Sequence, residues 1–202
     1  MPRQVDHAGR RQLIAEAVCR LADEHGLEGV TLRDVAARAE VSMGAVQRCF
    51  RTKEEMLVFT LGHIGERIVG RVRAARPAGS PARSAGAALG HAATEVALLR
   101  EEHRAEARVW LAFLAQAAVS ETLAATLRAD YAPLEEMFTR LVAEAAGGTD
   151  RAVPLDARRE ARTLLALADG LTAHVLIGRL TSREAQDVLQ ARLDGLRGAA
   201  GS

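Results

Sequence analysis

The chain has 202 residues, a length that suits one mid-sized domain or a small domain joined to a larger one. Its 27 basic and 26 acidic residues leave a net charge of +1, which excludes a general polyanion binder, so any DNA affinity must come from a local patch. No apolar run is long enough to span a membrane and no signal peptide is visible, so we expect a cytoplasmic protein. No long stretch alternates polar and apolar residues, which predicts an all-α fold of about nine helices.

The chain opens with a polar segment, residues 1–9, which we expect to be a mobile arm. Arg3, Arg10 and Arg11 could touch a phosphate group there, although solvated surface charge explains them equally well. A helix is expected over 12–25, where apolar residues recur at helical spacing, and Gly26 is expected to end it. This helix would support the segment that follows.

The segment 31–53 predicts two short helices joined by a tight turn at 39–41. Thr31 can cap the first helix, with Asp34 three residues later, and Ser42 can cap the second. Such a pair of helices is typical of the helix-turn-helix motif, whose second helix lies in the major groove of DNA. A surface helix in an ordinary helical bundle is the alternative.

If Val46 and Phe50 face the core, the opposite face of the second helix is small and polar at its start, with Gly44 allowing a close backbone approach. Gln47 can pair with a base edge and Arg48 with guanine, while the cations that follow can neutralise phosphates. The candidate DNA-binding residues are Thr31, Arg33, Ser42, Met43, Gly44, Ala45, Gln47, Arg48, Arg51 and Lys53.

A capping box at Thr52 and Glu55 predicts the start of a longer helix that runs to about residue 75, and the start of this helix can offer free N–H groups to a phosphate. Loops are expected at 73–84 and 147–154, where proline and glycine gather. Further helices are expected over 82–99, 101–119, 120–146, 156–180 and from 182 onward. Pro133 is expected to kink or restart the third of these.

The segment 156–180 is apolar on more than one face, so one side needs a partner beyond the domain core. Paired with the last helix and with their copies, these helices would form a four-helix dimer interface; a wholly internal helix in a monomer is the alternative. The candidate interface residues are Leu164, Leu167, Leu171, Val175, Val188, Leu189, Leu193 and Leu196.

Aromatic side chains make up only 3% of the chain, and most lie in the central helices. With a few polar neighbours they could line a mostly apolar pocket, although ordinary core packing also explains each one. The candidate ligand-binding residues are Glu95, Trp110, Phe113, Gln116, Tyr131, Met137, Phe138 and His174.

No catalytic motif is visible, so we expect no enzyme and no cofactor. His91 and His103 each have a glutamate three or four residues away, but further metal ligands are missing, so no metal site is predicted. Cys19 and Cys49 lack the spacing of a disulfide or zinc framework.

The segment 25–57 resembles the DNA-binding domain of the tetracycline-repressor (TetR) family of bacterial regulators. The matching residues are His25-Gly26, Val30 to Ala36, Val41 to Val46, Phe50 and Thr52 to Leu57. Gln47 and Cys49 stand where that family commonly has aromatic residues or histidine, which removes a phosphate or base contact and affects the operator sequence.

The second half resembles the TetR-family C-terminal domain of the choline-response repressor type, through Arg104 to Phe113, Ala168 to Leu171 and Gly178 to Leu180. This resemblance implies a helical bundle that binds a small effector and dimerises. We therefore expect a DNA-binding helix-turn-helix domain over 1–55 and a ligand-binding and dimerisation domain over 56–202.

The expected function is a homodimeric repressor that binds a palindromic DNA operator and is released by a small-molecule effector. Two other interpretations stay open. The first is a helix-turn-helix regulator without effector sensing, and the second is a small-molecule enzyme on a helical scaffold.

Overall fold

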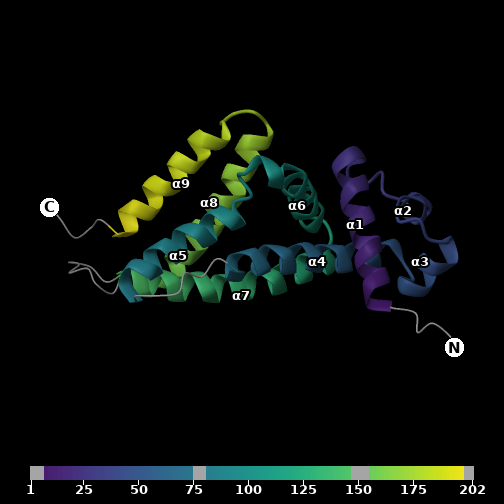
Figure 1. Cartoon of the computed structure of the whole chain (residues 1–202), viewed down its shortest axis with the longest axis horizontal. Helices are drawn as coiled ribbons and strands as arrows, with labels where there is room; N and C mark the ends of the chain where they lie inside the picture. The colour runs from purple at the N-terminus through teal and green to yellow at the C-terminus, as the bar shows by residue number, and fades with distance from the viewer. Residues whose placement is uncertain (1–6, 75–80, 147–154, 198–202) are drawn as a thin grey trace. The chain divides into compact units, whose positions relative to one another are not determined.

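The computed structural model describes residues 7–74, 81–146 and 155–197, and every regular element in these ranges is helical (Figure 1). The elements are α1 (His7–His25), α2 (Leu32–Arg38), α3 (Met43–Cys49), α4 (Lys53–Ala74), α5 (Pro81–Val96), the 3-10 turn η1 (Glu101–His103), α6 (Arg104–Ala117), α7 (Glu121–Ala146), α8 (Ala157–Leu176) and α9 (Ser182–Arg197). The all-α prediction is confirmed. No helix in the described part of the chain is long and apolar enough to cross a membrane.

Parts of three predictions lie outside the described residues. They are residues 1–6 of the expected arm, with Arg3, residues 75–80 of the loop after α4, and the expected loop 147–154.

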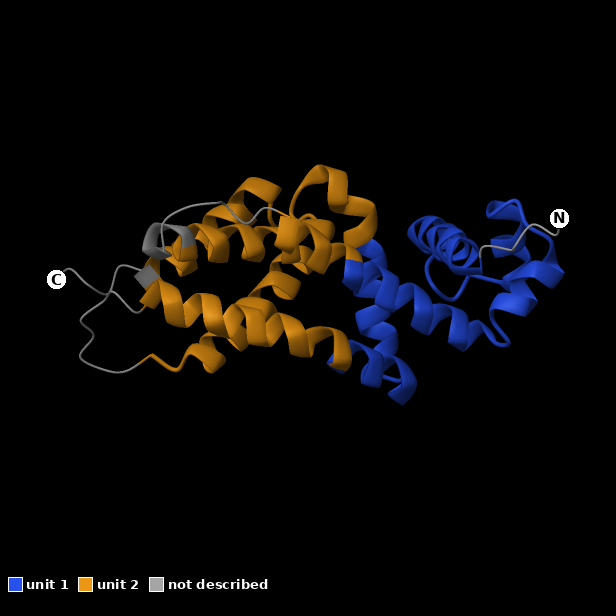
Figure 2. Cartoon of the chain, turned by 60° about the horizontal axis from the view of Figure 1, so that its bottom comes forward, with its two compact units in different colours: residues 1–66, 108–128 blue, residues 67–107, 129–202 orange. Residues whose placement is uncertain are grey.

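The chain divides into two compact units, which Figure 2 shows in different colours. Unit 1 comprises residues 1–66 and 108–128, and unit 2 comprises 67–107 and 129–202. Helices α4, α6 and α7 therefore each contribute to both units. The expected functional boundary after residue 55 falls within the first turn of α4, and it stays a prediction.

Unit 1 is built around the apolar faces of α1, α2 and α3. Ile14 and Val18 of α1, Val35 of α2 and Val46 of α3 are all 0% exposed. Helix α1 begins at His7 rather than at residue 12, so the expectation of an arm over 7–9 is wrong. The first turns of α1 are held by a tertiary contact: the guanidinium of Arg11 stacks on the rings of Phe50 and Phe59.

The ends of the first two helices follow from local backbone chemistry. Gly26 ends α1 with a φ of +72°, and its N–H donates to the Ala22 carbonyl oxygen at 2.9 Å, as predicted. After α2, Glu40 adopts a φ of +54° and the Val41 N–H donates to the Ala36 carbonyl oxygen at 3.0 Å. This tight turn lets α3 start three residues after Glu40.

Unit 2 packs α5, α8 and α9 against one another. The hydroxyl of Thr172 on α8 contacts the Ala97 carbonyl oxygen, 2.6 Å away, and the carbonyl oxygen of Ala168, 2.8 Å away. Since Thr172 is 2% exposed, this contact satisfies a buried polar group and joins α8 to the segment after α5. Helix α7 continues through Pro133, so the expected restart at that residue is wrong.

Several helices in the second half of the chain end earlier than expected, because the backbone leaves helical geometry. Helix α5 ends at Val96, and Leu98 then has a φ of +48°. Helix α8 ends at Leu176, two residues before Gly178 with a φ of +73°, rather than at residue 180. The expected helix 101–119 begins instead as η1 before α6 takes over, and it ends at Ala117.

Candidate nucleic-acid interface and effector domain

Side-chain caps fix where the two short helices of unit 1 begin. The Thr31 hydroxyl oxygen accepts the Asp34 N–H at 3.2 Å, and its O–H donates to the Asp34 carboxylate at 2.6 Å. The Ser42 hydroxyl oxygen accepts the Ala45 N–H at 3.2 Å, which sets the start of α3. Both predicted caps are confirmed, so residues separated by only three positions determine the register of the motif.

Helix α3 is oriented by two buried residues, Val46 at 0% exposure and Phe50 at 1%. Its opposite face therefore reaches the surface. The exposed members of the predicted DNA-binding set are Thr31, Arg33, Ser42, Met43, Gln47, Arg48 and Arg51, and Gly44 and Lys53 are partly exposed. Ala45 is only 6% exposed, so it lies beside the exposed face, one turn before the buried Cys49, and its contact with DNA stays a prediction.

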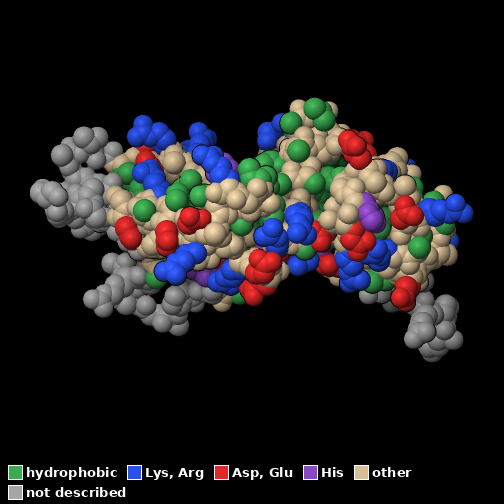
Figure 3. All heavy atoms as spheres, turned by 90° about the horizontal axis from the view of Figure 1, so that it is seen from above, with side chains coloured by type: hydrophobic (Ala, Val, Ile, Leu, Met, Phe, Trp, Pro, Cys, Tyr) green, Lys and Arg blue, Asp and Glu red, His purple; other side chains and the backbone are tan. Residues whose placement is uncertain are grey.

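Three arginines around α3 carry side chains without a charged partner among the described residues: Arg33, Arg48 and Arg51. Arg38 differs, because its guanidinium donates to both carboxylate oxygens of Glu24, at 2.7 and 2.6 Å. This pair lowers the pKa of Glu24 and raises the pKa of Arg38. Basic and acidic side chains are mixed over the face that Figure 3 displays, so unpaired arginines, rather than net charge, supply the local positive potential.

The surface at the start of α3 is open at Gly44. A Cβ built there would lie 3.5 Å from Nη1 of Arg48, an ordinary van der Waals distance. The Arg48 side chain therefore extends toward the start of α3, and its guanidinium lies beside Gly44, one helical turn earlier. The guanidinium, which has five N–H donors, thus lies beside backbone that no side chain covers at Gly44.

The start of α4 uses its capping groups internally. The Glu55 N–H donates to the Thr52 hydroxyl oxygen at 3.0 Å, and the Arg51 N–H donates to the Glu55 carboxylate at 2.9 Å. The predicted cap by Thr52 is confirmed, whereas the Glu55 carboxylate accepts from the residue before the cap; these two N–H groups are therefore not available for a phosphate. The Lys53 ammonium donates to the Glu28 carbonyl oxygen at 3.2 Å, so Lys53 also anchors the loop before α2.

The eight predicted ligand-binding residues fall in both units. Trp110 and Phe113 are buried and Gln116 is partly buried in unit 1, whereas the other five belong to unit 2. Within unit 2, the Tyr131 hydroxyl donates to the Asp169 carboxylate at 2.5 Å. The members in unit 2 are Glu95, Tyr131, Met137, Phe138 and His174.

Glu95 belongs to a buried ion network that the sequence analysis missed. Only 2% exposed, it accepts from Nε of Arg71 at 3.2 Å and lies 3.0 Å from Nη1 of Arg100. Arg71 also donates to both carboxylate oxygens of Glu106, at 3.0 and 3.2 Å. Both oxygens of Glu95 are therefore engaged by protein cations. Arg67 and Arg71, four residues apart beside the buried stripe of α4, are the signal that could have revealed it.

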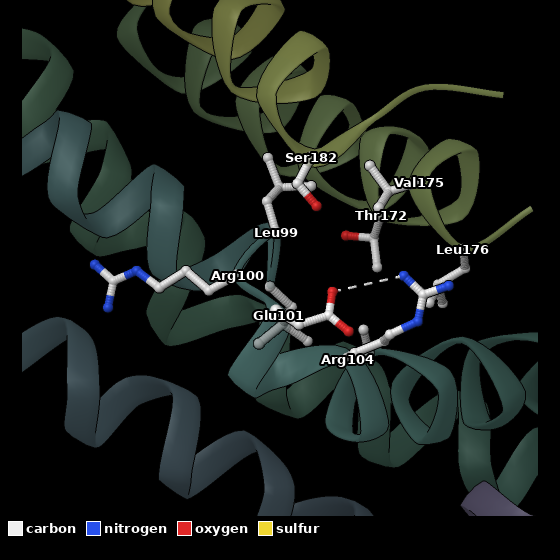
Figure 4. A pocket seen from close by; sticks show the side chains of 10 residues that line it. Leu99, Arg100, Glu101, Arg104, Thr172, Val175, Leu176 and Ser182 are labelled. Atoms are coloured by element: carbon white, nitrogen blue, oxygen red, sulfur yellow. Dashed lines mark ion pairs between the residues drawn. The ribbon is translucent and has the colours of Figure 1, made fainter. Parts of the chain in front are cut away.

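Figure 4 shows a cavity of unit 2 whose volume is about 10 Å³, the space of one water molecule. Thr172 and Val175 of α8 face it from one side, and Glu101 and Arg104, an ion pair at 3.9 Å, from the other. None of the predicted ligand-binding residues lines this cavity. An organic ligand does not fit into this cavity.

The predicted dimer residues are mostly buried within unit 2 itself. Leu164, Leu171, Leu189, Leu193 and Leu196 are all at most 4% exposed, so placing them at an interface between copies is wrong. Because α5, α8 and α9 pack on one another within the chain, these leucines are already buried without a second copy.

A different stripe of α8 and α9 is exposed. Ala166 and Gly170 on α8 and Ala191 and Gly195 on α9 are small and exposed. The large apolar residues beside them are Ile177, 73% exposed, and Val188, 44% exposed, while Leu167 and Val175 are partly buried. The second face of α8 that the sequence analysis expected to be covered by a partner thus carries small residues, Ala166 and Gly170, at the surface. Within the described residues, no three metal-ligating side chains gather in one place.

Both halves of the chain match known family models. Residues 14–58 match the model described as bacterial regulatory proteins, tetR family, and residues 85–198 match the model described as BetI-type transcriptional repressor, C-terminal. The HTH-type transcriptional regulator PksA of Bacillus subtilis (strain 168) is 31% identical over 179 residues, which cover 88% of this chain and 83% of PksA. These descriptions are those of transcriptional regulators rather than enzymes.

Solved structures agree on the fold. A transcriptional regulator from Rhodococcus sp. Rha1 superimposes with a TM-score of 0.78 and 30% identity, covering 92% of this chain and 95% of that chain. A regulator from Saccharomonospora viridis, solved in complex with choline, has a TM-score of 0.80 and 21% identity, covering 93% and 96% of the two chains.

Proposed function

This chain belongs to the TetR family of bacterial transcriptional regulators, and we propose that it is a homodimeric repressor whose α3 reads an operator in the major groove. The observation that carries the proposal is the outward face of α3. Ser42, Gln47 and Arg48 are exposed there, and Val46 anchors the opposite side in the core. A helix held from behind, with exposed polar side chains in front, has the form that groove reading requires.

Arg48→Ala tests the reading face. We expect operator affinity to fall about 10- to 100-fold, the usual cost of about 1–3 kcal/mol for one arginine–guanine pair, with no change in unfolding. The operator is sought in DNA upstream of the chain's own gene, with binding measured by fluorescence anisotropy at fixed salt. Arg73→Ala, an exposed cation of unit 2, is the control for loss of charge.

Lys53→Ala is expected to weaken binding uniformly across DNA sequences, because a phosphate contact carries no sequence information. Its hydrogen bond to Glu28 makes an unfolding measurement necessary for this variant. Unchanged affinity in both Arg48→Ala and Lys53→Ala would refute the assignment of these residues to the DNA contact.

The homodimer is proposed through the exposed stripe of α8 and α9. Small residues allow helices of two copies to approach closely, and a two-fold pair would present two reading helices about 34–36 Å apart, one DNA turn. Ala191→Glu, which places a carboxylate in the stripe, should give monomers in analytical ultracentrifugation. Gln186→Glu, exposed on the same helix, adds the same charge outside the stripe and should stay dimeric.

We also propose that a small effector controls operator binding, because residues 85–198 match the BetI-type C-terminal model. An effector that separates the helices of unit 2 would displace α4, which continues into unit 1, and a coupling of about 1–3 kcal/mol corresponds to a 5- to 150-fold change in operator affinity. A compound screen for operator release tests this, with choline included because the Saccharomonospora viridis regulator was solved with it.

A second candidate function is a TetR-type regulator without effector sensing. One observation favours it: both oxygens of Glu95, a predicted ligand-binding residue, are paired with arginines. Operator binding that no compound alters, together with an unchanged melting temperature across the screen, would select this function.

A further inference from the structure

A groove in unit 1 has a composition that DNA binding does not explain. It is lined by residues of α1 and α4 and by none of α3, and has a volume of about 470 Å³. Small-molecule sites in proteins commonly have volumes of about 300–1,000 Å³. Its lining residues are Ala8, Arg11, Gln12, Phe59, Gly62, His63 and Glu66.

Arg11 is held in this groove by aromatic stacking. Its guanidinium carbon lies 4.6 Å from the ring centre of Phe50 and 4.4 Å from that of Phe59, and the two rings are 5.4 Å apart. Its Nε atom is buried without a hydrogen-bond partner, and no carboxylate pairs with Arg11 among the described residues. A guanidinium that is already ordered and still has free donors is prepared to bind an anion.

The other groove residues define what kind of anion fits. Phe59, Ala8 and Gly62 give the groove an apolar side, and the Gln12 amide can hydrogen-bond beside Arg11. His63 is turned toward Glu16, its Nε2 lying 2.9 Å from the carboxylate. Glu66 is exposed at the groove, where it disfavours a polyanion such as the DNA backbone.

We propose that this groove is a second ligand site, which binds a small monocarboxylate with an apolar or aromatic body. The carboxylate is held by the free guanidinium donors of Arg11, and the body lies along Phe59 and over Gly62. Since Phe50 follows directly after α3, occupancy of the site alters the support of the reading helix. That last consequence rests on the proposed function, whereas the binding itself does not.

Gly62 provides a substitution that fills the groove without strain. A Cβ there meets nothing within 4 Å, so Gly62→Leu places its side chain in the groove and also replaces a poor helix former. Gly70 is the matched control: it lies on the same helix, its Cβ also meets nothing within 4 Å, and it does not line the groove. Arg11→Gln removes the charge while keeping a polar side chain.

The experiment titrates the full chain, without DNA, with 3-phenylpropionate and with its neutral amide by isothermal calorimetry. We expect saturable binding of the acid to the unmodified chain and to Gly70→Leu. Gly62→Leu and Arg11→Gln should each weaken it at least about tenfold, and the neutral amide should bind at least about tenfold more weakly than the acid.

Three results would overturn the proposal. They are no saturable binding of the acid, equal affinity in Gly62→Leu and Gly70→Leu, and binding of inorganic phosphate that equals that of the acid and ignores Gly62→Leu, which would indicate a bare anion site. Because no operator is present, each of these leaves the DNA-binding proposal standing. Conversely, the effect of Arg48→Ala on operator binding has no bearing on whether the groove binds the acid.

Discussion

Units 1 and 2 use their charged residues in opposite ways. Around α3 in unit 1, Arg33, Arg48 and Arg51 are exposed without a charged partner among the described residues. In unit 2, Arg71 and Glu95 are drawn into the interior and paired. An unpaired cation at the surface costs little and is available to a partner, whereas a buried one must be neutralised where it stands. The comparison separates surface cations that are open to a partner from an ion network that holds the fold together.

The largest expected effect lies in the buried network. Arg71→Met leaves Glu95 and Glu106 short of a cation, and we expect the free energy of unfolding to fall by about 2–3 kcal/mol, somewhat below the cost of breaking a fully buried pair, because Arg71 is 26% exposed. Urea denaturation measures it. Arg73→Met, two residues later and exposed, should change the value by less than about 0.5 kcal/mol. Equal effects in the two variants would remove the distinction between the units.

The next effect concerns the cap of α3. Ser42→Ala removes the acceptor of the Ala45 N–H and should cost about 1 kcal/mol of stability. Ser42→Asp keeps a capping oxygen and should restore the stability, but its negative charge should lower operator affinity. Thermal unfolding and DNA binding are measured on both variants. If Ser42→Asp binds DNA as the unmodified chain does, the start of α3 is distant from the phosphates.

Gly44→Ala should separate stability from binding at a single position. The added methyl group has room and replaces a poor helix former, so we expect a gain of up to about 1 kcal/mol in the free energy of unfolding. The same methyl group stands on the face proposed to approach DNA, so operator affinity should fall. A variant that gains stability and keeps full affinity would show that the backbone at Gly44 does not come close to the groove.

The smallest effect is a pH dependence at the surface of unit 1. Arg38 lowers the pKa of Glu24 below its ordinary value of 4.5, so the pair contributes stability above that pH and loses it as the pH falls through the lowered pKa. Glu24→Gln should therefore be slightly less stable at neutral pH, and its difference from the unmodified chain should vanish in acid. Melting temperatures from pH 7 to pH 3 follow this; a difference that persists in acid would assign the effect to packing.

Prediction from the sequence succeeded where the relevant contacts join residues that are close together in the chain. The caps at Thr31 and Ser42 each reach a backbone N–H three residues ahead, so they could be predicted without a fold. It failed at the start of α1, where Arg11 finds aromatic rings far along the chain. It also failed for five of the eight predicted dimer residues, because α5, α8 and α9 share their apolar stripes within one chain.

The amino-acid sequence by itself determined the helical class, the two-helix motif near the N-terminus and the orientation of α3, because capping and the helical period act over a few residues. Only the tertiary structure decided which polar side chains are used internally. Glu95 and Arg71 lie 24 residues apart, and no local pattern brings them together. The groove beside Arg11 arose in the same way, because its walls come from two helices whose proximity depends on the packing of the whole unit.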